Sequence, residues 1–243
     1  MTDLAQRLPG AERDQSHPNR RPKDAATLIL VDRSGKEPKV LLGRRHHGHV
    51  FMPGKFVFPG GRIDKTDRLI KPAAALHPQT QKKLMRGVPK ISAERARSLA
   101  LTAIRETFEE TGLLLGKPVK KITAAPNGPW AEMARLGYAP DLSGLHFIAR
   151  AITPPRRPRR FDTRFFSVDA GAVAHRADGI VHADAELVEL VWLPIAEARK
   201  LDLPTITGVV LQELESRVAA GFGHDLPVPF YRMLHGKFQR QLL

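Results

Sequence analysis

Three glutamates fall within five residues near the middle of the chain, in the segment RETFEETGL that begins at Arg105. Glu106, Glu109 and Glu110 stand at helical offsets of zero, three and four, so they share one face of a helix. Like charges at this spacing repel one another unless a cation neutralises them. A hard divalent ion such as Mg²⁺ prefers oxygen ligands and is commonly shared between carboxylates and phosphates. The cluster therefore predicts either a metal site or, as the alternative, a solvent-exposed acidic helix face.

The surrounding residues favour the metal site. The chain has 25 acidic residues against 39 basic ones, so three glutamates in five positions run against its general charge. Leu101, Ile104 and Phe108 recur at offsets of three and four on the roughly opposite face, which predicts a helix with one buried side and carboxylates facing a cleft. Ser92 is a candidate N-terminal cap and Gly112 a candidate terminator of this helix.

The elements that must position this helix follow from short apolar runs and turn residues. Residues 25–32 and 39–45 predict a β-hairpin, and residues 55–58 predict a strand that ends at Pro59-Gly60-Gly61, where we expect a sharp turn and no further strand pairing. Further strands are expected at 145–152, 161–168 and 187–193, and helices at 129–136, 195–201 and 206–219. Strands on both sides of a central helix predict an α/β fold in which helices sandwich a mixed sheet.

Length and composition agree with one decorated domain. The chain has 243 residues, of which 42% are hydrophobic, and no apolar run long enough to cross a bilayer. We expect a flexible tail over 1–24 and a single domain over 25–243, with a partly helical insertion at about 62–92 and a C-terminal helix and tail at about 204–243. The terminus lacks the apolar centre of a secretory signal, so we expect a cytoplasmic protein. The absence of cysteine excludes disulfides and thiol catalysis.

The formal charge of +14 is concentrated in two segments. Residues 62–92 contain eight Lys or Arg against two Asp, and residues 154–164 contain five Arg against one Asp. Fields of this kind attract nucleotide phosphates, coenzyme phosphates, nucleic acid or a membrane surface, and solvated basic segments are the alternative interpretation.

The two motifs together resemble the Nudix box. RETFEETGL, from Arg105 to Leu113, matches the signature half of the box, and the turn Phe58-Pro59-Gly60-Gly61 resembles its opening half. The separation between the halves exceeds that of the usual box by about thirty residues, which implies an insertion. Arg97 stands where the family carries an additional glutamate, and Thr107 stands at an apolar position.

The resemblance implies a fold, a cofactor and a set of roles. The fold is a Nudix-type α/β/α sandwich, and the cofactor is Mg²⁺ or Mn²⁺. Glu106, Glu109 and Glu110 would ligate the metal together with the carbonyl of Gly60, and Arg105 would orient a glutamate. The reaction would be metal-assisted hydrolysis of a diphosphate linkage. The catalytic base stays open between Glu106 and Glu186, with Glu189 as a rival to the latter.

A substrate class is implied by a second resemblance. Leu41, Leu42, Arg45 and Gly54 precede the turn with the spacing of a motif found in coenzyme A diphosphatases, and the insertion together with RRFDTRFF and the later LPT resembles the acyl-coenzyme A-cleaving branch. Coenzyme A also carries a 3′-phosphate, for which nearby arginines would have a use. These are Arg156, Arg157, Arg159, Arg160 and Arg164, and we single out Arg45, Arg160 and Arg164 as substrate-binding residues.

The alternatives differ in substrate or in class. Another nucleoside diphosphate derivative, such as ADP-ribose, a dinucleotide or a nucleotide sugar, is the alternative substrate. A Nudix-fold module that binds a nucleotide or RNA without cleaving it is the alternative from another class. The expected partner is a small-molecule nucleotide diphosphate rather than a membrane or nucleic acid, and a homodimer is compatible with the sequence.

Overall fold

The structure is a computed structural model that describes residues 16–48, 52–87, 91–120 and 126–243. Residues 1–15 of the predicted N-terminal tail lie outside the described residues. The strands are β1 (Lys23–Asp32), β2 (Lys39–Arg45), β3 (Phe56–Val57), β4 (Gly60–Arg62), β5 (Leu113–Pro118), β6 (Tyr138–Pro140), β7 (His146–Ile152), β8 (Phe161–Asp169), β9 (Val173–Arg176), β10 (Leu187–Pro194), β11 (Pro229–Leu234) and β12 (Lys237–Leu242). The α-helices are α3 (Pro78–Leu84), α4 (Ala93–Thr111), α5 (Pro129–Arg135), α6 (Ile195–Ala198) and α7 (Thr205–Ala219), and 3₁₀ turns occur at η1 (Asp67–Leu69) and η2 (Ala170–Ala172).

The main sheet is mixed. Its strand order is β10-β2-β1-β8-β7-β11-β12, with β3 paired to β2 and β4 paired to β1. β1 runs parallel to β8 and β11 runs parallel to β7, whereas the other neighbours in this sheet are antiparallel. A smaller sheet has the order β6-β5-β9. The prediction of a mixed α/β fold is therefore confirmed.

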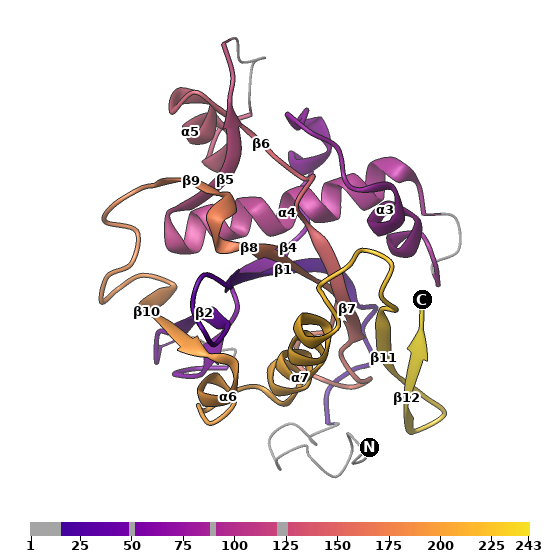
Figure 1. Cartoon of the computed structure of the whole chain (residues 1–243). Coiled ribbons are helices and arrows are strands. Elements are labelled where there is room, and N and C mark those ends of the chain that lie inside the picture. The colour runs from indigo at the N-terminus through magenta and orange to yellow at the C-terminus, as the bar shows by residue number, and fades with distance from the viewer. Residues whose placement is uncertain (1–15, 49–51, 88–90, 121–125) are drawn as a thin grey trace.

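Alternate residues of β1 enter two separate cores. Leu28 and Leu30 pack in one cluster with Ile104 of α4, whereas Ile29 and Val31 pack in another cluster that contains residues of α7. This alternation is expected when successive side chains of a strand point to opposite faces of a sheet. Figure 1 shows α4 along one face of the sheet and α7 against the other. The result is the predicted three-layer arrangement. No described helix is both long and apolar enough to cross a membrane.

The double-glycine turn continues into a strand, contrary to the prediction that pairing stops there. β4 pairs antiparallel with the first half of β1, where Thr27 faces Gly60 and Ala26 faces Gly61. The edge of β1 is free at this point because β2 pairs with β1 at Val31 and the residue after it. A Cβ on Gly60 would lie 2.6 Å from the carbonyl oxygen of Ala26, so the close approach requires glycine.

The predicted C-terminal tail is also corrected. The helix expected at 206–219 is present as α7, but the chain then forms a hairpin of β11 and β12 that extends the main sheet. Phe230 faces Arg150 of β7 in the parallel register and is only 1% exposed. Pro227 and Pro229 are turn residues, and they obscure the alternation of apolar and polar residues along a strand of only six residues. The sequence pattern alone therefore predicted a tail.

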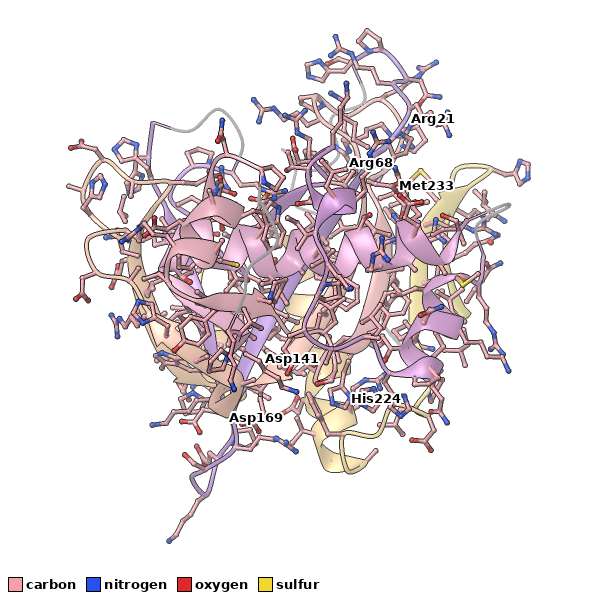
Figure 2. All side chains as sticks on the ribbon, turned by 90° about the horizontal axis from the view of Figure 1, so that it is seen from above. Arg21, Arg68, Asp141, Asp169, His224 and Met233 are labelled. Atoms are coloured by element: carbon pink, nitrogen blue, oxygen red, sulfur yellow. The ribbon has the colours of Figure 1, made fainter. Side chains whose placement is uncertain are left out.

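A stack of three histidine rings connects the insertion to the C-terminal part of the chain. The ring of His224 lies 4.0 Å from that of His77 and 3.9 Å from that of His146, with interplanar angles of 8° and 11°. His224 is labelled in Figure 2. The pKa of His146 is lowered to about 3, chiefly by burial and in addition by the neighbouring His224 and the guanidiniums of Arg217 and Arg33.

We expect this stack to make the folded chain sensitive to acid. The folded chain holds His146 neutral, whereas the unfolded chain binds a proton below its ordinary pKa of 6.5. Stability is therefore lost as the pH falls from about 6.5 toward 3, and at pH 5 the loss from this site is roughly 1–2 kcal/mol. The free energy of unfolding in urea, determined at pH 7 and at pH 5, measures this loss.

His146→Phe keeps an aromatic ring and removes the titrating group. We expect this variant to lose less stability between pH 7 and pH 5 than the wild type does. His235→Asn, at an exposed histidine, serves as the control and should follow the wild type. Equal pH dependence in all three proteins would contradict the assignment to His146.

Candidate active site

The helix α4 begins and ends where the sequence predicts. The hydroxyl of Ser92 accepts a hydrogen bond from the backbone N–H of Arg95 at 3.1 Å, and Gly112 adopts a left-handed conformation with φ of 74° while its N–H donates to the carbonyl of Phe108. Leu101 and Ile104 are fully buried. The apolar face therefore anchors the helix in the core and fixes the direction in which its polar residues point.

Two of the three predicted glutamates face the double-glycine turn. Glu110 is 7% exposed, and one of its carboxylate oxygens accepts a hydrogen bond from the N–H of Gly60 at 3.1 Å. A Cβ on Gly61 would lie 2.4 Å from the carboxylate carbon of Glu106, so this glycine leaves space for that side chain. The turn and the helix thus form one unit, as the two halves of the motif predict.

Glu109 points elsewhere. Its carboxylate forms an ion pair with Arg105 at 2.7 Å, and 43% of its side chain is exposed. The predicted trio is therefore divided in this structure into Glu106 and Glu110 at the turn and Glu109 beside the guanidinium.

A third carboxylate approaches from β10. Glu186 precedes this strand and forms an ion pair with Arg45 of β2 at 3.1 Å. Its rival Glu189 is paired with Arg44 at 2.8 Å and does not line either of the two cavities described below. Glu186 is thus the late glutamate that the structure brings to the site.

The carboxylates of Glu106 and Glu110 at the turn hold protons more tightly than usual. The pKa of Glu106 is raised to about 7, chiefly by burial and in addition by the charges of Glu109 and Glu186, while Arg105 opposes the rise. Burial, followed by the charges of Glu186 and Glu106, raises the pKa of Glu110 well above its ordinary value, although the N–H of Gly60 and the charge of Arg45 oppose the rise. Two carboxylates that are so poorly compensated are suited to a cation.

The residues fit a hard divalent ion, although they do not form a complete cage. Within the described ranges, no three acidic or imidazole side chains gather closely enough to hold an ion as they stand. Mg²⁺, however, commonly uses one or two carboxylates and takes its remaining ligands from water and substrate phosphates. Glu106 and Glu110 supply such a pair, and Gly60 lies beside them.

The guanidinium of Arg105 is held by a residue that sequence reasoning missed. Asp67 is fully buried and accepts hydrogen bonds from Arg105 at 2.8 Å, Trp130 at 3.0 Å, Thr102 at 2.8 Å and the N–H of Asp64 at 2.9 Å. Arg105 in turn donates to Glu106, Glu109 and the carbonyl of Arg62. The insertion therefore supplies the residue that fixes Arg105. An aspartate in a basic insertion gave no signal of this role.

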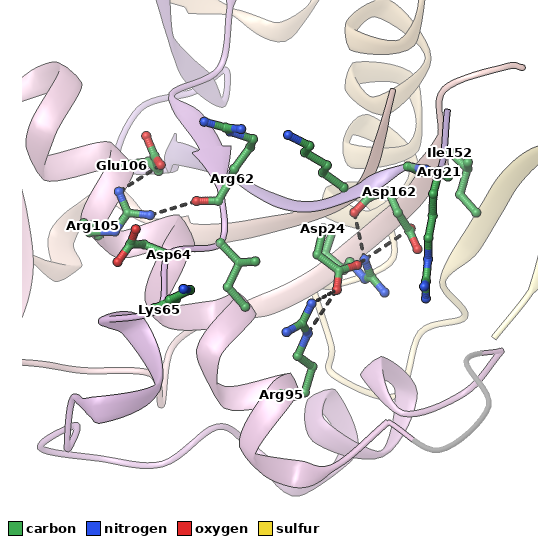
Figure 3. A pocket seen from close by; sticks show the side chains of 14 residues that line it. Arg21, Asp24, Arg62, Asp64, Lys65, Arg95, Arg105, Glu106, Ile152 and Asp162 are labelled. Carbon is green, nitrogen blue, oxygen red and sulfur yellow. Dashed lines mark hydrogen bonds and ion pairs between the residues drawn. The ribbon is translucent and has the colours of Figure 1, made fainter. Parts of the chain in front are cut away.

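Two cavities meet at the carboxylates. The smaller one has a volume of about 430 Å³ and contains Glu106, Glu110 and Glu186 together with Arg45 and apolar residues such as Phe58 and Phe165. The larger one has a volume of about 1010 Å³ and is shown in Figure 3. Both are lined by Arg62 and Glu106, so one elongated ligand can occupy both.

The two arginines predicted from the basic segment are engaged with the protein. Arg164 is 1% exposed and forms ion pairs with Asp24 at 2.6 Å and Asp162 at 3.2 Å. Arg160 donates to the carbonyl of Thr153 at 3.1 Å and to the side chain of Asn19 at 2.8 Å. As placed here, both hold strands and the chain before β1 together, and their role in substrate binding stays a prediction. Arg164 lines the larger cavity and Arg45 lines the smaller one.

The comparisons with known proteins identify the family. No family model matches the chain. The chain is 28% identical over 156 residues to nudix hydrolase 7 of Caenorhabditis elegans; the match covers 59% of this chain and spans less than half, 43%, of that relative. The solved structure of a NUDIX hydrolase from Alicyclobacillus acidocaldarius is 30% identical, with a TM-score of 0.60, and the match covers 79% of this chain and 90% of that one. The chain therefore belongs to the Nudix hydrolase superfamily.

Proposed function

We propose that this protein is a divalent-metal-dependent hydrolase that cleaves a diphosphate linkage in a nucleotide derivative. The observation that carries the proposal is a pair of carboxylates, the buried Glu110 and the partly buried Glu106, which face the double-glycine turn where two cavities meet. Carboxylates that are removed from water with little compensating charge destabilise a fold. A metal-dependent reaction explains why this chain has two of them at one site. A binding module would have no need of them.

Different residues of the site have different roles in metal binding, orientation and proton transfer. Glu106 and Glu110 would hold the Mg²⁺ or Mn²⁺, with the carbonyl of Gly60 as a further candidate ligand. A bound divalent ion neutralises diphosphate charge and lowers the pKa of water. Arg105 orients Glu106 through an ion pair of 2.9 Å. Glu109 acts on the site through Arg105 in this arrangement.

Glu186 is our candidate for the catalytic base. It lines the smaller cavity, about half of its side chain is exposed, and its carboxylate interacts electrostatically with both Glu106 and Glu110. In the proposed step it accepts a proton from the attacking water, whose oxygen bonds to phosphorus as the bridging phosphorus–oxygen bond opposite it breaks. Glu106 is the alternative base.

Coenzyme A or an acyl derivative is the proposed substrate, with 3′,5′-ADP and a phosphopantetheine product. The sequence motif around Leu41, Leu42, Arg45 and Gly54 supports this proposal. The two joined cavities support it as well, because the substrate has two long arms on either side of its diphosphate.

A substrate panel tests the proposal. Coenzyme A, acetyl-coenzyme A, ADP-ribose, a diadenosine polyphosphate and a nucleotide sugar are incubated with the protein and Mg²⁺ or Mn²⁺, with EDTA as the control, and the products are separated by liquid chromatography. We expect 3′,5′-ADP from the coenzyme A compounds and none with EDTA. Consumption of ADP-ribose with intact coenzyme A would overturn the substrate, and no metal-dependent turnover of any compound would overturn the activity.

A further inference from the structure

The larger cavity is a groove that runs from the carboxylates toward the beginning of β1. Figure 3 shows Glu106 and Arg105 at one end and Arg21 and Ile152 at the other, with Asp24 between them. In Figure 2, Arg21 lies at the edge of the molecule opposite His224. A ligand arm that leaves the diphosphate at Glu106 in the direction of Arg21 therefore has room to bind.

The carboxylates in this groove are largely compensated by the protein. Asp24 is paired with Arg164 at 2.6 Å and also with Arg95, and Asp162 is paired with Arg150 at 2.6 Å. These ion pairs hold β1, β7, β8 and α4 together and neutralise the negative charge of Asp24 and Asp162. Asp64 is exposed and turns its carboxylate back onto the N–H and hydroxyl of Thr66.

Four cations at the groove have no ion-pair partner in the described part of the chain. They come from the approach to β1, from β1 itself, from β4 and from the insertion: Arg21, Lys23, Arg62 and Lys65. All four are exposed, so they carry their charge into the groove without the cost of burial. The lining as a whole has seven cationic side chains against four carboxylates, which makes the groove attractive to an anion.

The two cavities therefore differ in chemistry on either side of the shared residues Arg62 and Glu106. The smaller one has aromatic and aliphatic walls, including Phe58, Phe165 and Ile206, and its three arginines are matched by three glutamates. The larger one has seven cationic side chains against four carboxylates, so its net charge is positive. A substrate whose diphosphate lies at Glu106 would place an apolar arm in the first and a charged arm in the second.

We infer that the groove binds a phosphomonoester carried by one arm of the substrate, and that Arg21, Lys23 and Lys65 make the protein prefer substrates with this additional phosphate. The inference rests on the proposed function, because it takes the diphosphate to lie at Glu106. It assigns the recognition of the extra phosphate to the edge formed by residues 21–23 and the insertion, not to the arginine-rich segment that the sequence singled out. Arg62, shared by both cavities, contacts the diphosphate.

The experiment compares substrates that differ only in the additional phosphate. One pair is coenzyme A and 3′-dephospho-coenzyme A, and a second pair is NADPH and NADH. The groove variant is Arg21→Gln combined with Lys23→Gln and Lys65→Gln. The control variant removes the same charge at exposed lysines outside the groove, through Lys36→Gln, Lys82→Gln and Lys237→Gln. Binding of adenosine 3′,5′-bisphosphate and AMP to the metal-free proteins, measured by calorimetry, gives a readout that does not depend on turnover.

We expect the wild type and the control variant to favour the phosphorylated member of a cleaved pair by about tenfold in kcat/KM, through KM. In the groove variant this ratio should fall toward one because KM rises only for the phosphorylated member. The bisphosphate should bind the wild type about tenfold more tightly than AMP does, and this difference should also disappear in the groove variant.

The experiment distinguishes failure of this inference from failure of the proposed function. If the groove variant keeps the discrimination, or the wild type has none in either assay, the inference is wrong while diphosphate hydrolysis stands. If no compound is hydrolysed, the proposed function is wrong, and the calorimetry still decides whether the groove binds the phosphomonoester.

Discussion

Glu110→Gln lowers the rate of diphosphate hydrolysis by about a thousandfold or more, because it removes one of two charges that would hold the metal, a loss of several kcal/mol in the transition state. Glutamine keeps the shape of the side chain, and its amide oxygen can still accept the hydrogen bond from Gly60. Steady-state rates with Mg²⁺ and Mn²⁺ measure the effect. Glu94→Gln, at an exposed position in the first turn of the same helix, is the matched control and should keep the wild-type rate.

The loss of activity should not come from unfolding. In the metal-free chain the raised pKa of Glu110 means that its charged form is destabilising, so its contribution worsens as the pH rises above the ordinary carboxylate range. At pH 8 without metal, Glu110→Gln should therefore be at least as stable as the wild type, and Mn²⁺ should stabilise it less than it stabilises the wild type. Thermal unfolding with and without Mn²⁺ checks both statements.

Glu109→Gln provides a contrast on the same helix. Its carboxylate contacts Arg105 and is 43% exposed, so its removal should cost only about ten- to a hundredfold in activity. A loss at Glu109 as large as the loss at Glu110 would show that Glu109 turns into the site when the metal binds.

Asp67→Asn lowers the melting temperature by about 10 °C, because it leaves Arg105 in a buried site without its main counter-charge, a change that costs roughly 3–5 kcal/mol. Each group that approaches the two oxygens of Asp67 is a hydrogen-bond donor, so an amide nitrogen in either position would meet another donor. Differential scanning calorimetry measures the shift. Activity should fall as well, since Arg105 loses its orientation.

Asp64→Asn is the control for this prediction. Asp64 lies on the same turn and is exposed, and its carboxylate accepts hydrogen bonds from Thr66, while only its backbone N–H, which the substitution keeps, donates to Asp67. We expect a change in melting temperature of at most a few degrees. Equal shifts for Asp64→Asn and Asp67→Asn would show that the turn, and not the buried ion pair, limits stability.

The central helix and its turn could be predicted from local patterns. Ser92 and Gly112 marked the ends of α4, and the spacing of Leu101, Ile104 and Phe108 marked its buried face, because caps and periodicity act within a few residues. The prediction from the sequence placed all three glutamates on one face, whereas Glu109 is paired with Arg105 away from the turn. Successive helical residues are rotated by about 100°, so Glu106 and Glu110 are closer in direction than Glu109 and Glu110 are.

Features that depend on distant contacts escaped prediction. β4 forms because one stretch of the edge of β1 is free, and the β11–β12 hairpin forms because an edge of β7 is available for pairing. The sequences of β4, β11 and β12 alone do not show that these edges are free. Asp67 binds Arg105 across 38 positions of sequence. Arg164 looked like a phosphate ligand by composition, whereas its partners Asp24 and Asp162 become apparent only when β1 lies beside β8.

The anomalous scattering of a crystal soaked in Mn²⁺ tests the metal-binding assignment most directly. We predict a peak between the carboxylates of Glu106 and Glu110, next to the double-glycine turn, and its absence from an identically soaked crystal of Glu110→Gln. Density for manganese only at other positions, with the two glutamates in contact with water or protein alone, would contradict the account.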